Sequence, residues 1–223
     1  MTIFLIVYFA ALFCYLFTRT GENKLYRAIN KYVMALMYMG LSIYIFFKKY
    51  DFVSYQSLLQ AALFLAFLGD IFLVFDFGRG GDFFLSGNVC FIIYEQIILV
   101  ANGYALKDFF WIYIVAGAML ITFIIACGKM PDKIKIGKMR WPMTFYLSSI
   151  FTHGISGLAL MLMLPNTNFF MMGLGSFLFM ISDMILTSYK FIFNNNKWLI
   201  RFNSLTYFVG LLLIVLAMVP DII

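Results

Sequence analysis

The sequence is poor in charged residues, histidine and cysteine, and each shortage excludes a class of protein. Of its 223 residues, 12% are charged and 64% are hydrophobic, whereas about a quarter of an ordinary soluble domain is charged. A soluble globular domain is therefore excluded, and a polytopic membrane protein is indicated. The single histidine, His153, cannot supply a multi-histidine metal site, and the three cysteines lack CxxC spacing. No metal, disulfide or other cofactor is expected.

Known catalytic motifs and prolines are also scarce. The sequence contains no GxSxG, HExxH or Walker motif, which argues against a serine hydrolase, a zinc peptidase and a P-loop enzyme. Its four prolines lie in loops or at the ends of apolar runs, so no expected span has the central break found in many transporters. The net charge of +6 comes from basic residues between apolar runs rather than from a patch. No nucleic-acid partner is therefore expected.

Long hydrophobic runs fill most of the chain and determine the expected fold. A transmembrane helix needs roughly 20 mostly apolar residues. On that basis the sequence predicts an all-α integral membrane protein, a bundle of eight transmembrane helices in a single domain, 1–223. The first run has no basic leader and no small-residue cleavage site, so we expect it to be retained as a span. The expected spans are residues 2–17, 32–47, 54–75, 83–105, 109–127, 142–164, 168–189 and 199–219.

Basic residues are shared unevenly between the loops, which predicts an orientation. The odd-numbered loops contain Arg19, Lys24, Arg27, Lys31, Arg79, Lys129, Lys133, Lys135, Lys138, Arg140, Lys190, Lys197 and Arg201, and the even-numbered loops contain Lys48, Lys49 and Lys107. Because positive residues collect on the cytoplasmic side, the odd loops are expected to be cytoplasmic and both termini outside. The expected location is the plasma (cell inner) membrane.

Two aspartates occupy corresponding places in the third and seventh spans. The stretch "LFLAFLGDIFL" around Asp70 aligns with "SFLFMISDMIL" around Asp183, 113 residues later. A small residue, Gly69 or Ser182, precedes each aspartate and lets a neighbouring helix approach closely. The pattern predicts a parallel repeat of two four-helix halves, with chance as the alternative because Phe and Leu are frequent. Both aspartates are expected in the cytoplasmic half of the membrane.

Two more polar residues are expected in the membrane interior, Glu95 in the fourth span and His153 in the sixth. Acids inside a membrane are costly and mark functional sites, although a protonated acid can also act as inert hydrogen-bonding glue. Two carboxyl groups a few ångströms apart can share one proton, so that one serves as general acid and the other as general base. The sequence thus favours a hydrolytic enzyme. A proton-coupled transporter or a lipid-binding membrane protein using the same acids is the alternative.

The sequence resembles the YhhN-like transmembrane family, whose characterised members are lysoplasmalogenases. The resemblance rests on the order and spacing of four stretches: "LFLAFLGDIFLVF", "FFLSGNVCFIIYEQIIL", "SFLFMISDMILTSYKF" and "SLTYFVGLLLI". It implies a membrane hydrolase that cleaves the vinyl-ether bond of a lysophospholipid, releasing a fatty aldehyde and a glycerophospho-head group, without a cofactor. Two departures stand out. Family members usually have histidine where this chain has Glu95, and glutamine where it has Leu211.

The resemblance also suggests roles for individual residues. Asp70 and Asp183 take the family's acidic positions. From the chemistry of vinyl-ether hydrolysis we expect one of them to be the acid and the other the anionic partner, with Glu95 orienting water or tuning the pair. The supporting or substrate-binding candidates are His153, Tyr207, Asn88, Gly69, Ser182 and Thr206. The candidates to hold the phosphate are Arg79, Arg140, Lys190 and Arg201, although membrane orientation alone also explains their positions. Partners beyond the lysophospholipid and membrane lipid, and the oligomeric state, are left open.

Overall fold

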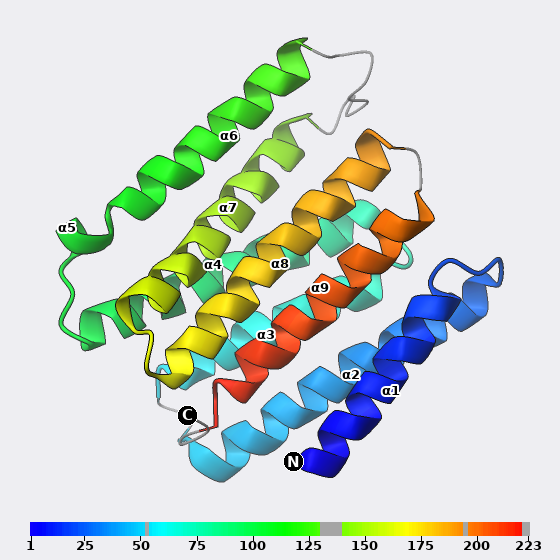
Figure 1. Ribbon diagram of the computed structural model, residues 1–223, viewed down its shortest axis with the longest axis horizontal. Helices are drawn as coiled ribbons and strands as arrows, with labels where there is room; N and C mark the ends of the chain where they lie inside the picture. Colours follow the sequence, from blue (N-terminus) through cyan, green and yellow to red (C-terminus); the bar gives the residue numbers. More distant parts are fainter. Residues whose placement is uncertain (52–53, 130–139, 194–195, 220–223) are drawn as a thin grey trace.

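The computed structural model describes residues 1–51, 54–129, 140–193 and 196–219, and all regular structure in this part of the chain is helical. Figure 1 shows long helices lying side by side. The helices are α1 (Thr2–Thr18), α2 (Lys24–Lys49), α3 (Gln56–Phe72), α4 (Phe77–Ala101), α5 (Leu106–Phe109), α6 (Trp111–Lys129), α7 (Arg140–Met163), α8 (Asn168–Phe191) and α9 (Lys197–Leu216).

The all-helical prediction is confirmed, and the number of spans is confirmed in part. Six of the described helices are long and apolar enough to cross a membrane, counting α5 and α6 together. The other two, α1 and α3, have 17 residues each, which is at the short limit for a span. The count of eight spans therefore stays a prediction, as does the orientation. Of the residues behind that orientation, Lys133, Lys135 and Lys138 lie outside the described residues.

Two helices begin well before the expected spans because side-chain caps start them. The Asn23 carboxamide oxygen accepts hydrogen bonds from the backbone N–H groups of Leu25 and Tyr26, so α2 begins at Lys24. The Asp76 carboxylate caps α4 in the same way. Such caps satisfy backbone donors that the first helical turn leaves free. In α2 the cap extends the helix by two turns and makes Lys31 a helical residue instead of a loop residue.

The described helices form a ring. Helix α1 packs on α2, α2 on α3 and α3 on α4. Helix α4 then packs on α7, α7 on α8 and α8 on α9, and α9 closes the ring against α1 and α2. Helix α6 packs on the outside of α7. A long-range hydrogen bond of 2.8 Å from the Tyr8 hydroxyl to the Phe208 carbonyl joins α1 to α9 at the closure. In Figure 1, α1 begins and α9 ends at the same end of the bundle.

Small residues let neighbouring helices approach closely at two corresponding places. A Cβ atom on Gly175 of α8 would lie 2.6 Å from the Gly210 carbonyl oxygen of α9, so the two backbones are in contact. Between α3 and α4, a Cβ on Gly87 would lie 3.2 Å from the Ala62 carbonyl oxygen. Ala62 and Gly175 are separated by the same 113 residues as the two aspartates. The glycines that face them, Gly87 and Gly210, are 123 residues apart, so the repeat of two halves stays a prediction.

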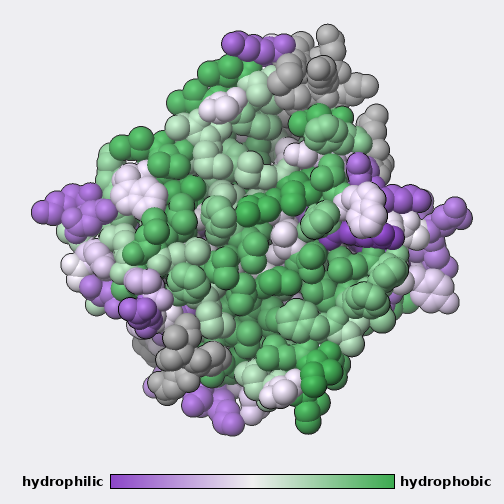
Figure 2. All heavy atoms as spheres, in the orientation of Figure 1, coloured by the Kyte–Doolittle hydropathy of each residue, from purple (hydrophilic) through white to green (hydrophobic). Residues whose placement is uncertain are grey.

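The surface fits a membrane environment. Figure 2 shows apolar side chains along the middle of the helices, and hydrophilic side chains at the edges where the helices end. Large apolar side chains such as Ile3, Ile114 and Leu162 are more than half exposed. Exposed apolar surface on this scale is unusual for a soluble monomer and normal for helices that face lipid.

Candidate active site

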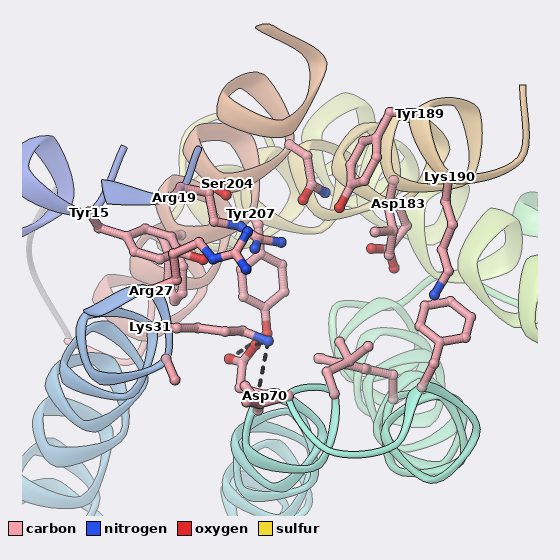
Figure 3. A pocket seen from close by; sticks show the side chains of 18 of the residues that line it. Tyr15, Arg19, Arg27, Lys31, Asp70, Asp183, Tyr189, Lys190, Ser204 and Tyr207 are labelled. Carbon is pink, nitrogen blue, oxygen red and sulfur yellow. Dashed lines mark hydrogen bonds and ion pairs between the residues drawn. The ribbon is translucent and has the colours of Figure 1, made fainter. Parts of the chain in front are cut away.

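A polar cavity of about 390 Å³ lies inside the ring, at the end of the bundle where α2 begins and α3 ends. Both predicted aspartates line it, Asp70 from α3 and Asp183 from α8. Helices α1, α2, α4 and α9 contribute the remaining helical part of the wall. Figure 3 shows the two carboxyl groups on different sides of the space, with basic and tyrosine side chains between and around them. The structure thus brings together two acids that are 113 residues apart in the sequence.

Asp70 is held by a cation and by two tyrosines. The Lys31 ammonium lies 3.1 Å from Asp70 Oδ1 and also donates to the Asp70 carbonyl oxygen at 3.1 Å. Oδ2 accepts hydrogen bonds from the hydroxyls of Tyr38 at 3.2 Å and Tyr207 at 2.8 Å. The Asp70 side chain is 1% exposed and that of Lys31 is 13% exposed. A buried carboxylate needs this kind of pairing, so the contacts suit an ionised Asp70.

Asp183 has a different environment. Its Oδ2 accepts a hydrogen bond of 2.7 Å from the Tyr146 hydroxyl of α7, and within the described residues no cation is paired with it. It is 4% exposed. The hydrogen bonds in the described part of the chain do not join Asp183 to Asp70 directly. The two acids share a cavity, but they differ in charge environment.

Basic residues outnumber acids around the cavity. Among its described lining residues, the basic ones are Arg19, Lys24, Arg27, Lys31 and Lys190, against the two aspartates. Arg19 and Arg27 lie on the same side as Lys31 in Figure 3. The Nε atom of Arg19 is buried and has no hydrogen-bond partner in the residues that the structure describes. Lys190 lies across the space, with its ammonium 2.9 Å from the centre of the Phe77 ring. This excess of positive charge can accommodate an anion.

The residues expected to hold a phosphate are mostly elsewhere. Of the four, Lys190 lines the cavity. Arg79 is exposed and pairs with Asp76, and Arg201 donates to the Thr20 hydroxyl at 3.0 Å. The side chain of Arg140 lies outside the described part of the structure. The other basic residues that line the cavity come from the end of α1 and the start of α2, where the sequence indicates only membrane orientation.

Glu95 and His153 are brought together, but in a second cluster that does not line the cavity. His153 Nδ1 lies 3.2 Å from Glu95 Oε1, and the Ser176 hydroxyl donates to the same carboxylate at 2.7 Å. All three residues are fully buried. Within the described part of the chain, the Nε2 atom of His153 and the hydroxyl of Ser156 have no hydrogen-bond partner. The expected cluster of three acids and a histidine is therefore divided into two polar sites.

Aromatic side chains separate these two sites. Phe91 stacks on the His153 ring with the ring centres 4.8 Å apart. Phe179 lies between the sites, with its ring centre 5.6 Å from that of His153 and 5.3 Å from that of Tyr207. Because Tyr207 binds Asp70, Phe179 forms an apolar partition between the cavity and the Glu95 cluster. The sequence gives only the depth of each acid along its helix, and depth alone does not predict this partition.

The small residues before the aspartates contact neighbouring helices, as the close-approach argument requires. A Cβ atom on Gly69 would lie 2.8 Å from the Phe84 ring of α4. The Ser182 hydroxyl donates to the Asn203 carbonyl of α9 at 3.1 Å, and the Asn203 amide donates back to the serine hydroxyl at 2.8 Å. Gly69 and Ser182 thus position the helices that carry the acids. Neither of them lines the cavity, whereas Asn203 does.

The other supporting candidates differ in position. Tyr207 lines the cavity and binds Asp70 directly. The Asn88 side-chain amide donates to the Ser149 hydroxyl at 3.2 Å, and neither residue lines the cavity. Its side-chain carbonyl oxygen is buried and has no partner among the described residues. The Thr206 hydroxyl donates to its own helix, to the Phe202 carbonyl at 2.8 Å. Only Tyr207 of this group therefore contacts a candidate catalytic acid.

Sequence reasoning missed the partners of the two acids. Lys31 was assigned to a cytoplasmic loop, because a lysine beside an apolar run is also what membrane orientation produces. Tyr38 and Tyr146 gave no signal among 14 tyrosines. A helical spacing could have indicated Tyr38, which lies two turns after Lys31 and therefore on the same helix face. No group of three or more His, Cys, Asp or Glu side chains among the described residues could hold a metal ion.

The fold and the cavity fit a multi-pass helical membrane protein that carries a buried pair of acids beside an anion-accepting surface. The chain belongs to the YhhN family, whose family model matches residues 26–218. The match begins near the start of α2 and includes both aspartates and all the helices from α3 to α9. No curated protein and no solved structure matches the chain.

Proposed function

We propose that the protein is a membrane hydrolase that cleaves the vinyl-ether bond of lysoplasmalogens, releasing a fatty aldehyde and a glycerophospho-head group. The observation that carries this proposal is the unlike pair of acids in one cavity: among the described residues, Asp70 is bound by a cation and the Asp183 carboxyl group by a tyrosine hydroxyl alone. Membership of the YhhN family is consistent with this function. The proposed substrate is a single-chain lipid taken from the surrounding membrane.

Vinyl-ether hydrolysis needs two carboxyl groups in different states. A proton is delivered to the β-carbon of the double bond, and the α-carbon and ether oxygen then share a positive charge. A water molecule adds to the α-carbon, and the resulting hemiacetal breaks at its bond to the glycerol oxygen, leaving the aldehyde and the free hydroxyl. A protonated acid must therefore stand near the β-carbon and an anion near the developing cation.

The contacts assign these two states to the two aspartates. Asp70, with the Lys31 ammonium and two hydroxyl donors, is suited to remain ionised and to stabilise the cation. Asp183 lacks a cation within the described residues and, being buried, is least costly when neutral. It is the proposed proton donor, and it recovers its proton when water adds to the α-carbon. Tyr146 keeps the Asp183 carboxyl group in a fixed orientation.

The basic side of the cavity is suited to the phosphate of the head group. Arg19 and Arg27 lie near Lys31, and arginine binds phosphate oxygens through paired donors. The buried Nε atom of Arg19 has no hydrogen-bond partner among the described residues, so this donor is available to a phosphate oxygen. Glu95 and His153, which lie behind the aromatic partition, have no part in the proposed chemistry.

Aldehyde release from purified protein tests the proposal. The substrates are lysoplasmenyl-choline and lysoplasmenyl-ethanolamine, and the variants are Asp70→Asn and Asp183→Asn, which keep the side-chain shape and remove the acid. We expect release by the wild type and at least a hundredfold loss in both variants, equal to about 2.7 kcal/mol of transition-state stabilisation. Asp51→Asn, an exposed aspartate at the far end of the bundle, is the matched control and should retain full activity.

Two outcomes would contradict the proposal: no aldehyde from the wild type, or undiminished release from both cavity variants. Thermal unfolding midpoints in the same detergent would show whether a loss of activity comes from loss of the fold. If the wild type is inactive, proton uptake into liposomes containing the protein would test the alternative, a proton-coupled transporter that uses the same acids.

A further inference from the structure

A second cavity, of about 450 Å³, lies beside the polar one and is lined mainly by apolar side chains. It lies between the start of α4, the start of α7 and the end of α8. Its wall includes Leu85 and Gly81 from α4, Met143 and Phe145 from α7, and Phe191 from α8. Phe145 is 64% exposed, so this wall reaches the surface of the bundle that faces lipid.

The apolar and polar cavities are adjacent. Leu73, Phe77, Phe84 and Leu186 line both of them. Tyr146 connects them chemically, because its side chain lines the apolar cavity while its hydroxyl donates to Asp183 in the polar one. A molecule that occupied both spaces would therefore pass beside the proposed proton donor.

The polar groups in the wall of the second cavity are mostly satisfied within the protein. The Tyr146 hydroxyl is used by Asp183, and the Thr187 hydroxyl donates to the Asp183 backbone carbonyl at 2.9 Å. Asp82 of α4 also lines the cavity. The rest of the wall offers a ligand little hydrogen bonding and a largely hydrocarbon surface. A ligand that suits it is apolar along its whole length, and ligand cavities of a few hundred Å³ are common for such molecules.

We propose that this second cavity holds the hydrocarbon chain of the substrate and limits its length, an inference that rests on the proposed function. The occupant is one unbranched lipid chain, because the adjoining polar cavity supplies cations for a head group, and Tyr146 links the apolar wall to Asp183. With the chain between α4, α7 and α8 and the head group beside Arg19 and Arg27, the bond next to the chain lies at Asp183. In this arrangement the substrate enters laterally from the membrane, through the apolar cavity.

The selection of chains in this cavity works by size. In water, each buried methylene group favours binding by about 0.8 kcal/mol. A chain that leaves a bilayer or a micelle exchanges one apolar environment for another, so most of that gain is absent. Chain length therefore matters chiefly where the cavity ends. Filling the cavity with a larger side chain should lower the accepted length without greatly weakening the binding of short chains.

Gly81 is the position for that substitution. A Cβ atom on Gly81 would meet no atom within 4 Å, although the residue lines the cavity, so Gly81→Leu adds bulk to the space without a clash with the backbone. The matched control is Gly117→Leu in α6, where a Cβ is equally free and no described cavity is lined. Thermal midpoints should be the same for both variants.

Two readouts separate this inference from the proposed function. The first is photolabelling by a non-cleavable alkyl lysolipid with a diazirine at the chain end, with peptide mapping and competition by unlabelled lysolipid. We expect competed labels in 77–85, 142–146 or 186–191 of the wild type and of Gly117→Leu, and their loss in Gly81→Leu. The second is aldehyde release from hexadecenyl and decenyl lysoplasmenyl-ethanolamine. Gly81→Leu should lower kcat/KM for the longer chain relative to the shorter by about tenfold.

Each result has a definite meaning. Labels that map elsewhere, or that Gly81→Leu leaves unchanged, overturn the chain cavity even if the wild type releases aldehyde. An unchanged chain preference in Gly81→Leu, with active enzyme, overturns it as well. Competed labels in the cavity with no aldehyde from any substrate support the chain site and reject the proposed reaction, which separates the two failures.

Discussion

Replacing Lys31 with methionine tests the charge assignment on which the mechanism depends. The substitution keeps the length and the apolar stem of the side chain and removes the ammonium that lies 3.1 Å from Asp70 Oδ1. If Asp70 is ionised, Lys31→Met leaves a carboxylate that is 1% exposed without a cation. Removal of one partner of a buried ion pair costs about 3–5 kcal/mol. If both groups were neutral, the loss would be that of a hydrogen bond, about 1 kcal/mol.

The size of the effect distinguishes the two cases. We expect a loss near 3 kcal/mol, because Lys31 is partly exposed and the two tyrosine hydroxyls still bind Asp70 in the variant. For a chain of this size the unfolding midpoint should fall by roughly 10 °C, measured by circular dichroism in detergent. Lys48→Met is the matched control, because Lys48 is an exposed lysine at the other end of the same helix, and its midpoint should not change.

A second substitution makes the test decisive. In Lys31→Met/Asp70→Asn the unpaired charge is gone, so the midpoint should recover most of the loss while aldehyde release stays abolished. The assignment would be refuted if the double variant had an unfolding midpoint as low as that of Lys31→Met. It would also be refuted if Lys31→Met had the same unfolding midpoint as the wild type. Either result would mean that Asp70 does not carry the charge proposed for it.

Further predictions concern the other acid, the second polar cluster and the helix packing. Tyr146→Phe removes the hydroxyl that orients Asp183 and should lower kcat for aldehyde release by about tenfold with little change in KM; unchanged kcat would show that the hydroxyl is not needed. Glu95→Gln should destabilise the protein by about 1 kcal/mol, because it weakens the contact with His153, while aldehyde release continues. A loss of aldehyde release as large as that in Asp70→Asn would show that Glu95 takes part in the reaction. Gly175→Val should destabilise the protein by about 1–3 kcal/mol, because even a Cβ there would lie 2.6 Å from a backbone oxygen of α9. An unfolding midpoint equal to that of the wild type would contradict this packing.

The sequence was sufficient to find the acids but not their environments. Asp70 and Asp183 stand out because acids are rare in apolar runs, and their corresponding positions placed them at one level. Residue counting gives depth along a helix and says little about which face a side chain occupies. Glu95 was therefore grouped with the aspartates, although Phe179 separates it from them.

The sequence also concealed the cation of the site. The start of α2 depends on the Asn23 cap, which moves the helix start from the expected residue 32 to Lys24. A hydropathy window cannot detect such a cap, because the capped turn is polar. Lys31 was therefore interpreted as an orientation signal, whereas it is the ionic partner of Asp70. A polar residue within one or two turns of a span can belong to the site as readily as to the loop.

The order of the helices around the ring also determines when the site is completed during synthesis. Lys31 and Asp70 are 39 residues apart on α2 and α3, so they can neutralise each other as soon as the first three helices have been inserted. Tyr207 follows Asp70 by 137 residues, which at translation rates of 5–20 residues per second corresponds to roughly 7–27 s. A nascent chain therefore carries its charged pair into the bilayer early and acquires the last wall of its cavity only when α9 arrives. A chain truncated before α9 would keep the ion pair and lack an enclosed place for substrate.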